Sequence, residues 1–299
     1  MIGIIYYAYG APTSIDDVRT YFSHILNGKP VPTPMMEQIE ASFKKSGFPD
    51  FIASSTQRIA KGLETLLNSQ LEEPVKVYNA YKHTTPFVQD AVKQALNDGV
   101  TTIVTLPINL IFSASGGGAV HQEVANLVAQ NNIKHIAITD WHTDEGIVNV
   151  YTERVTRALH WLPLAAQDNA HILFTVHSQP IDPERNAIYV KQFTELATAI
   201  ATKANIHNFH LTYRSSGGKA NWLEPDVKDK IRVLHASGST GFVTCELLSL
   251  TADVESYFEI GEQCQQLCHE LGVPFAVAEF PGDSFDTVYA LATLVASRI

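Results

Sequence analysis

Short apolar runs alternate with longer amphipathic segments along the whole chain. The runs are rich in β-branched and aromatic residues and predict eight strands, at residues 2–9, 75–81, 101–108, 135–140, 171–178, 208–214, 242–247 and 274–279. Helical apolar spacing predicts helices at residues 15–26, 35–45, 86–97, 120–131, 145–161, 186–204, 254–271 and 284–299, and one that ends near residue 70. This alternation predicts an α/β fold with parallel sheets and right-handed crossovers.

Four predicted strands lie on each side of about residue 143. We therefore expect two similar Rossmann-like halves, residues 1–143 and 144–299, with a cleft between them. Each half is expected to be a four-stranded parallel sheet flanked by helices. The last helical segment, residues 284–299, is expected to pack back on the first half.

The composition is that of an ordinary globular protein, with 299 residues, 45% of them hydrophobic and 17% charged. The formal net charge of −10 argues against a nucleic-acid partner, since phosphate backbones attract basic surfaces. The first ten residues have no basic segment and predict a strand rather than a signal peptide. No apolar run is long enough to cross a bilayer, so we expect a cytoplasmic protein without membrane insertion. Separately, we expect a monomer.

Three cysteines, Cys245, Cys264 and Cys268, are an odd number in a long chain and argue against a disulfide framework. Cys264 and Cys268 are four residues apart on a predicted helix, with His269 beside them. An iron–sulfur cluster requires four good ligands, so we expect packing roles for these cysteines and no cluster.

His177 is the first candidate for chemistry, because it ends an apolar strand and Pro180 follows it closely. In open α/β sheets, ligands bind outside the carboxyl ends of the strands. A neutral imidazole at that position can accept a proton or bind a metal. The alternative is a structural histidine that is hydrogen-bonded to a neighbour.

Glu255 and Glu259 open a predicted helix after the strand at residues 242–247. Their spacing of four places both on one helix face, where a carboxylate pair can hold protons or pass a cation. The alternative is a capping role, since the helix dipole favours acidic groups at this end.

Two loops and one group of aromatic residues are further candidates. Residues 113–118 are small and precede a helix, which suits either an anion site or a flexible turn. Arg214 and Lys219 lie in a glycine-containing loop that suits either an anionic ligand or solvent. Tyr9 and Tyr21, with neighbouring aromatic residues, suit either a flat apolar ligand or an ordinary core.

Taken in chain order, these motifs resemble the ferrochelatases, which insert ferrous iron into a porphyrin. His177 and Pro180 match the family's His-Ser-x-Pro motif, Trp222 opens a Trp-Leu-x-Pro motif, and Glu255 opens a helix similar to Glu-Thr-Leu-x-Glu. Residues 3–12, 82–87 and 112–115 are similar to the family's opening strand, second strand end and Tyr-Ser-x-Ser loop. The resemblance runs from the first strand to the last helix, and Tyr9 has the form seen in the coproporphyrin-using bacterial branch.

The resemblance implies a haem-biosynthetic enzyme that takes Fe(II) and either coproporphyrin III or protoporphyrin IX as substrates and holds no tightly bound cofactor. His177 and Glu255 would be catalytic, one taking the pyrrole protons and the other pairing with the resulting charge or guiding the metal. The metal-contacting residues would be His177, Glu255, Tyr9 and Glu259. The porphyrin-binding residues would be Tyr9, Tyr21, Asn27, Ser113, Ser115, Arg214 and Trp222.

Several positions depart from the family pattern. Arg214 stands where the family has glutamine, Asp253 where it has histidine or cysteine, and Glu246 where it has proline. Further departures are Leu26 and Asn27 in place of a basic pair, residues 47–51 in place of a Ser-Pro-Leu turn, and three glycines at 116–118.

These departures motivate an alternative function, a tetrapyrrole- or haem-binding paralogue with little or no chelatase activity. Tyr9 or His177 would then be an axial ligand. A phosphate- or nucleotide-binding α/β domain is a third interpretation, and it rests only on the glycine-containing loops.

Overall fold

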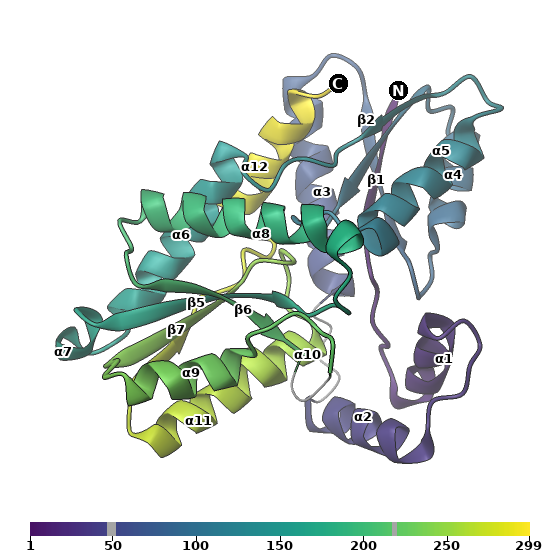
Figure 1. Cartoon of the computed structure of the whole chain (residues 1–299). Coiled ribbons are helices and arrows are strands. Elements are labelled where there is room, and N and C mark those ends of the chain that lie inside the picture. The colour runs from purple at the N-terminus through teal and green to yellow at the C-terminus, as the bar shows by residue number, and fades with distance from the viewer. Residues whose placement is uncertain (47–51, 217–219) are drawn as a thin grey trace. The chain divides into compact units, whose positions relative to one another are not determined.

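The computed structural model describes residues 1–46, 52–216 and 220–299 (Figure 1). Within these residues, eight strands form two four-stranded sheets whose neighbouring strands are all parallel, so the α/β fold class is confirmed. Two predictions lie outside the described residues: the replacement of a Ser-Pro-Leu turn at residues 47–51, and an anion-binding role for Lys219.

The chain divides into two compact units. Unit 1 contains residues 1–108, 115–139 and 291–299, and unit 2 contains residues 109–114 and 140–290. The chain therefore passes between the units more than once, whereas we expected a single boundary near residue 143.

The sheet of unit 1 has the order β2-β1-β3-β4. Its strands are β1 (Ile2–Ala8), β2 (Val75–Tyr81), β3 (Thr102–Pro107) and β4 (Lys134–Ala137). Its helices are α1 (Ile15–Ile25), α2 (Thr33–Ser46), α3 (Ala53–Gln70), α4 (Val88–Asn97) and α5 (Ala119–Val128), and a short π-helical turn η1 (Ala114–Gly118) precedes α5. All seven residues of β1 are buried, which explains its continuous apolar run.

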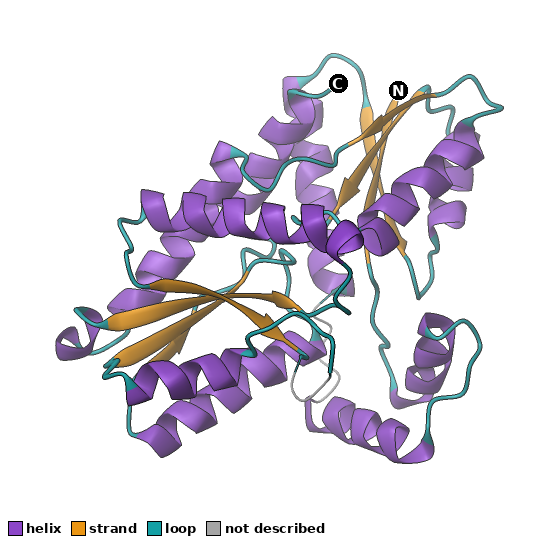
Figure 2. Ribbon diagram, in the orientation of Figure 1, coloured by secondary structure: helices purple, strands orange, loops and turns teal. Residues whose placement is uncertain are grey.

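The sheet of unit 2 has the order β6-β5-β7-β8. Its strands are β5 (Ala170–His177), β6 (Phe209–Arg214), β7 (Gly241–Glu246) and β8 (Phe275–Val277). Its helices are α6 (Glu145–His160), α7 (Leu164–Gln167), α8 (Pro183–Lys203), α9 (Val227–Ala236), α10 (Val254–Ser256) and α11 (Cys264–Leu271). Helix α12 (Phe285–Ala296) begins in unit 2, and from residue 291 onwards it belongs to unit 1. Helices α6 and α8 cover one face of this sheet, and α9 and α11 cover the other (Figure 2).

The helix that we expected over residues 254–271 has three parts in the structure. Between α10 and α11 lies a π-helical segment, η2 (Tyr257–Gln263). π-Helical turns are rare and are frequent at functional sites, and their wider turn was not detectable from apolar spacing.

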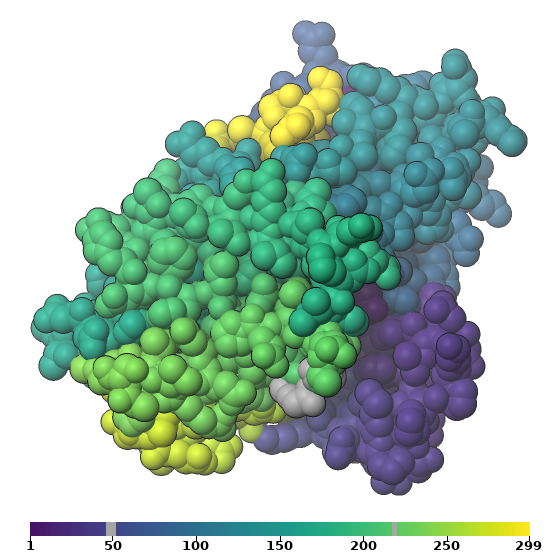
Figure 3. Space-filling model, viewed as in Figure 1, coloured from purple at the N-terminus to yellow at the C-terminus, as the bar shows by residue number. Residues whose placement is uncertain are grey.

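Helices α9 and α11 pack together through an apolar core that includes Val227, Ile231, Cys264 and Cys268. Both helices also contribute to the molecular surface, where they are light green and yellow (Figure 3). Burial raises the pKa of the Cys268 thiol to about 12, so this cysteine behaves as a small apolar side chain. No helix among the described residues is both long and apolar enough to span a bilayer.

Candidate active site

His177 is the last residue of β5, a central strand of the unit 2 sheet. Parallel pairing sets it beside Arg214 at the end of β6. The hydroxyl of Tyr189 donates a hydrogen bond to the His177 carbonyl oxygen at 2.8 Å, which fixes the backbone there. The imidazole Nδ1 lies 2.5 Å from the Ser178 carbonyl oxygen. Because a carbonyl only accepts, Nδ1 carries a proton in this geometry.

His177 and Glu255 are in direct contact. The imidazole Nε2 lies 3.2 Å from the Glu255 Oε2, and the two side chains are 32% and 54% exposed. Burial raises the pKa of Glu255, but the hydrogen bond with His177 and the charge of Arg214 outweigh it. The pKa of this carboxyl therefore lies below its ordinary value, and Glu255 is ionised at neutral pH.

The first turn of α10 sets the direction of Glu255. Asp253 caps this turn, because its Oδ1 accepts a hydrogen bond from the Ser256 backbone N–H at 2.7 Å. The Ser256 hydroxyl oxygen in turn accepts from the Asp253 backbone N–H at 2.9 Å. This reciprocal pair explains why the helix begins at Val254 and why Glu255 lies in its first turn.

Glu259 lies one turn further on and holds the loop that follows β6. Its two carboxylate oxygens accept from the Ser215 backbone N–H and hydroxyl, each at 2.7 Å. The same hydroxyl lies 3.3 Å from Glu255 Oε2, so both glutamates meet at Ser215. Ser215 has a φ of 60°, a left-handed conformation that these hydrogen bonds stabilise.

Arg214 is buried beneath this pair, with only 2% of its side chain exposed. Its guanidinium bonds Glu246 through Nε at 3.1 Å, Glu255 through Nη1 at 3.0 Å and Asp253 through Nη2 at 2.7 Å. In this structure the guanidinium therefore holds three carboxylates, whereas we expected Arg214 to contact the porphyrin.

Glu246 is the innermost of these carboxylates, with 1% of its side chain exposed. Burial raises its pKa to about 7, although the charge of Arg214 opposes this shift. One oxygen accepts from Arg214, whereas Oε1 has no hydrogen-bond partner among the described residues.

The His-Ser-x-Pro and Trp-Leu-x-Pro segments pair with each other after the strands end. The Ile181 N–H donates to the Asn221 carbonyl at 2.7 Å, and the Leu223 N–H donates to the Gln179 carbonyl at 2.9 Å. This bridge brings the Trp222 ring to 6.4 Å from the His177 ring, measured between centroids. The two motifs therefore build one site, although more than forty residues separate them.

Tyr9 lies in a separate cluster in unit 1. Its side chain is 42% exposed, and its ring centroid is 4.4 Å from that of His83 and 5.6 Å from Lys82 Nζ. The His83 Nδ1 lies 2.8 Å from the His24 Nδ1. Burial, with the nearby Lys82 and His24, lowers the pKa of His83 to about 4. His83 is therefore neutral at physiological pH.

The remaining predicted residues have local contacts. The Tyr21 hydroxyl donates to the Gly10 carbonyl at 2.9 Å, and Asn27 is exposed with a φ of 53° just beyond α1. The Ser115 carbonyl accepts from Lys82 Nζ at 2.5 Å. Ser113 belongs to unit 2 and Ser115 to unit 1.

Within unit 2 the structure thus brings together His177, Glu255, Glu259 and Trp222. In the described part of the chain, no group of three or more histidine, cysteine and acidic side chains has the arrangement of a metal-binding cluster.

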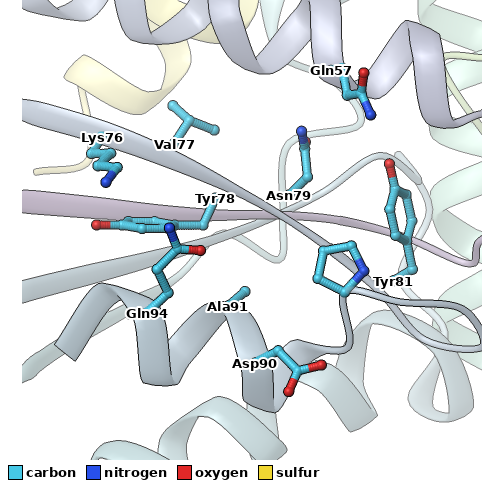
Figure 4. Close-up of a pocket in the computed structure, with 10 residues that line it drawn as sticks. Gln57, Lys76, Val77, Tyr78, Asn79, Tyr81, Asp90, Ala91 and Gln94 are labelled. Atoms are coloured by element: carbon cyan, nitrogen blue, oxygen red, sulfur yellow. The ribbon is translucent and has the colours of Figure 1, made fainter. Parts of the chain in front are cut away.

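A cavity of about 270 Å³ lies in unit 1, lined by β2, α3 and α4 (Figure 4). Its lining includes Gln57, Asn79, Tyr81 and Asp90. It contains none of the predicted site residues, so we do not assign the metal chemistry to it.

A model of the family Ferrochelatase matches residues 1–299, which is the whole chain. The chain belongs to the ferrochelatase family. It is 28% identical over 308 residues to a coproporphyrin III ferrochelatase of Geobacillus sp. (strain WCH70), covering 100% of this chain and 98% of that protein. The corresponding Bacillus subtilis (strain 168) enzyme is 27% identical over 305 residues, with 100% and 98% covered.

Solved structures agree with the two-unit chelatase fold of this ferrochelatase. SirB from Bacillus subtilis with Fe3+ superposes with a TM-score of 0.64 at 13% identity, covering 99% of this chain and 95% of that one. CbiX, the terminal enzyme for biosynthesis of siroheme in denitrifying bacteria, gives 0.55 at 10% identity, with 100% and 99% covered. At such identities the likeness concerns the fold alone.

Family membership makes the protein a metal chelatase of haem biosynthesis that inserts iron into a porphyrin, as the motifs implied. Sequence reasoning assigned no role to His24, His83, Asp253 or Glu246. For Asp253 and Glu246 a signal was present, because both are departures from the family pattern. For His24 no pattern in the sequence indicates that it meets His83.

Proposed function

We propose that the porphyrin substrate is coproporphyrin III and that His177 and Glu255 carry the insertion of Fe(II). The contact between His177 Nε2 and Glu255 Oε2, at 3.2 Å and partly exposed at the carboxyl end of β5, is the observation that carries this proposal. The relatives from Geobacillus and Bacillus subtilis support the choice of porphyrin, since they are coproporphyrin III ferrochelatases.

The hydrogen-bonding pattern of His177 supports its role as the proton acceptor. Nδ1 donates to a carbonyl, so Nε2, which lies 3.2 Å from the Glu255 Oε2, is the ring nitrogen that can accept a proton. A pyrrole proton taken up at Nε2 would make an imidazolium beside this carboxylate. The ionised Glu255 stabilises that positive charge.

Glu259 and Tyr9 would complete the path of the metal in this proposal. Glu259 lies one turn beyond Glu255 and shares Ser215 with it, so its carboxylate can pass Fe(II) towards Glu255. The Tyr9 hydroxyl, on a half-exposed side chain of unit 1, would contact the metal within the porphyrin. Tyr21, Asn27, Ser113, Ser115 and Trp222 would contact the macrocycle.

We further propose that the protein works in the cytoplasm as a monomer, with no iron–sulfur cluster and no tightly bound cofactor. Three free, buried cysteines support this proposal, because a cluster takes four good ligands and a cytoplasmic protein keeps its thiols reduced. Light scattering after size exclusion measures the mass. Iron and sulfide analysis of the purified protein detects any cluster.

Anaerobic Fe(II) insertion, measured side by side with coproporphyrin III and protoporphyrin IX, tests the function. We expect faster insertion into coproporphyrin III. The His177→Ala variant should lose insertion while porphyrin fluorescence still reports binding, and His269→Ala, an exposed histidine on α11, should behave as wild type. Near wild-type turnover by His177→Ala would refute the assignment. Tight haem binding without turnover on either porphyrin would favour the haem-binding paralogue.

A further inference from the structure

Arg214, Glu246 and Asp253 come from three separate elements and meet in one buried cluster. Arg214 ends β6, Glu246 ends β7, and Asp253 caps α10. Strand β5 lies between β6 and β7, and the register places His177 beside Arg214. The cluster therefore lies at the end of β5, directly behind the residues that we assign to the chemistry.

The guanidinium is planar and offers donors in fixed directions, and this cluster uses three of them. Nε points to Glu246, Nη2 to Asp253 and Nη1 to the same Oε2 of Glu255 that contacts His177. Exposure rises from 1% for Glu246 and 2% for Arg214 to 34% for Asp253 and 54% for Glu255. The cluster thus runs from the interior outwards and ends at the reactive carboxylate.

We propose that Arg214 is a positioning residue for metal insertion: anchored by Glu246 and Asp253, its guanidinium holds the Glu255 carboxylate against His177. This inference rests on the roles proposed above for His177 and Glu255. It assigns Arg214 no contact with the porphyrin or the iron.

Glu246 explains why the Arg214 guanidinium is held in one direction. A buried guanidinium without acceptors and opposite charge would be strongly destabilising. Glu246 accepts from its Nε within the sheet, and Asp253 and Glu255 supply carboxylates further out. The Glu246 Oε1, however, remains without a hydrogen-bond partner among the described residues. Because an unpaired buried oxygen lowers stability, stability alone does not account for the cluster, whereas fixing the direction of Arg214 does.

The test compares variants that change the guanidinium but keep the charge balance. Arg214→Lys keeps the positive charge but loses the planar set of donors with fixed directions, because an ammonium is a point charge. The double variant with Arg214→Gln and Glu246→Gln removes both inner charges and keeps neutral hydrogen-bonding groups. Arg232→Lys is the matched control, since Arg232 is 55% exposed and pairs with Asp229 in its own helix.

The readouts are kcat per porphyrin-binding site, KM for the porphyrin and the midpoint of thermal unfolding. We expect kcat per site to fall about tenfold or more in Arg214→Lys and in the double variant, with KM within about twofold. Loss of folded protein lowers the number of binding sites but leaves kcat per site unchanged, so a merely structural role is distinguished. If Arg214→Lys does not fold, the double variant alone tests the proposal.

Wild-type kcat per site in either folded variant would overturn the proposal, as would a loss confined to KM. The His177→Ala variant is measured in parallel. If His177→Ala is inactive while both Arg214 variants turn over normally, the positioning role fails and the proposed function stands. If wild-type protein inserts no iron into either porphyrin, the proposed function itself fails.

Discussion

Replacing Glu246 by glutamine is expected to change how the stability of this protein depends on pH. The carboxyl has 1% of its side chain exposed, and burial raises its pKa from 4.5 to about 7. Between these two values the folded protein binds more protons at this position than the unfolded chain does. Stability from Glu246 is therefore present at low pH and falls as the pH rises towards 7.

The size of the effect follows from the shift. At about 1.4 kcal/mol per pKa unit, raising the pKa from 4.5 to about 7 lowers the free energy of unfolding by about 3 kcal/mol above the folded-state pKa. Glutamine keeps a neutral acceptor for Arg214 Nε and does not titrate. The stability of Glu246→Gln relative to wild type should therefore rise by about 2–3 kcal/mol from pH 5 to pH 8.

Urea unfolding at several pH values between 5 and 8, followed by circular dichroism, measures this difference. Glu279→Gln is the control, because that side chain is 70% exposed and its relative stability should vary far less with pH. A constant difference between Glu246→Gln and wild type over this pH range would refute the reasoning. A relative stability that falls with pH would mean that the Arg214 charge outweighs burial.

Two further predictions concern packing in unit 2, and equilibrium unfolding in urea checks both. Phe174→Ala empties a side-chain position with 0% exposure on β5 and should lower the free energy of unfolding by about 3–5 kcal/mol, whereas Phe285→Ala, with 75% exposure, should change it by about 0.5 kcal/mol or less. Gly146→Ala places a Cβ 2.9 Å from the Ala290 Cβ and should lower stability by about 1–3 kcal/mol. Gly261→Ala meets open space and should be neutral or stabilising, so equal effects at the two glycines would contradict the packing argument.

Sequence patterns predicted the fold class because each strand is a short apolar run buried in a parallel sheet. Strand β1, with seven buried residues, shows the pattern clearly. The short β4, which carries exposed and half-buried residues, was predicted to start one residue too late and to end three residues too late. The π-helical segment η2 could not be distinguished from an α-helix by the spacing of its apolar residues, because one wider turn changes that spacing little.

The candidate site was predictable only in part. His177 and Glu255 were detectable from a strand end, a helix start and a family resemblance, and each is partly exposed. Arg214 was expected to contact a ligand, because a cationic residue in a glycine-containing loop suits an anionic ligand, and its burial was not expected. Its burial depends on Glu246 and Asp253, which lie 32 and 39 residues away along the chain.

The sequence by itself determined the strand–helix alternation, the family and the identity of the two residues that we assign to catalysis, because periodicity and short motifs are local properties. The tertiary structure decided the surroundings of those residues. The strand order β6-β5-β7 and the parallel register place Arg214 beside His177, and the cap of α10 directs Glu255 towards both. Contacts between residues far apart in the chain arise from sheet topology, which no local pattern records. Here these contacts bring together Arg214, Glu246 and Asp253, the three departures from the family pattern, in one buried cluster next to His177 and Glu255.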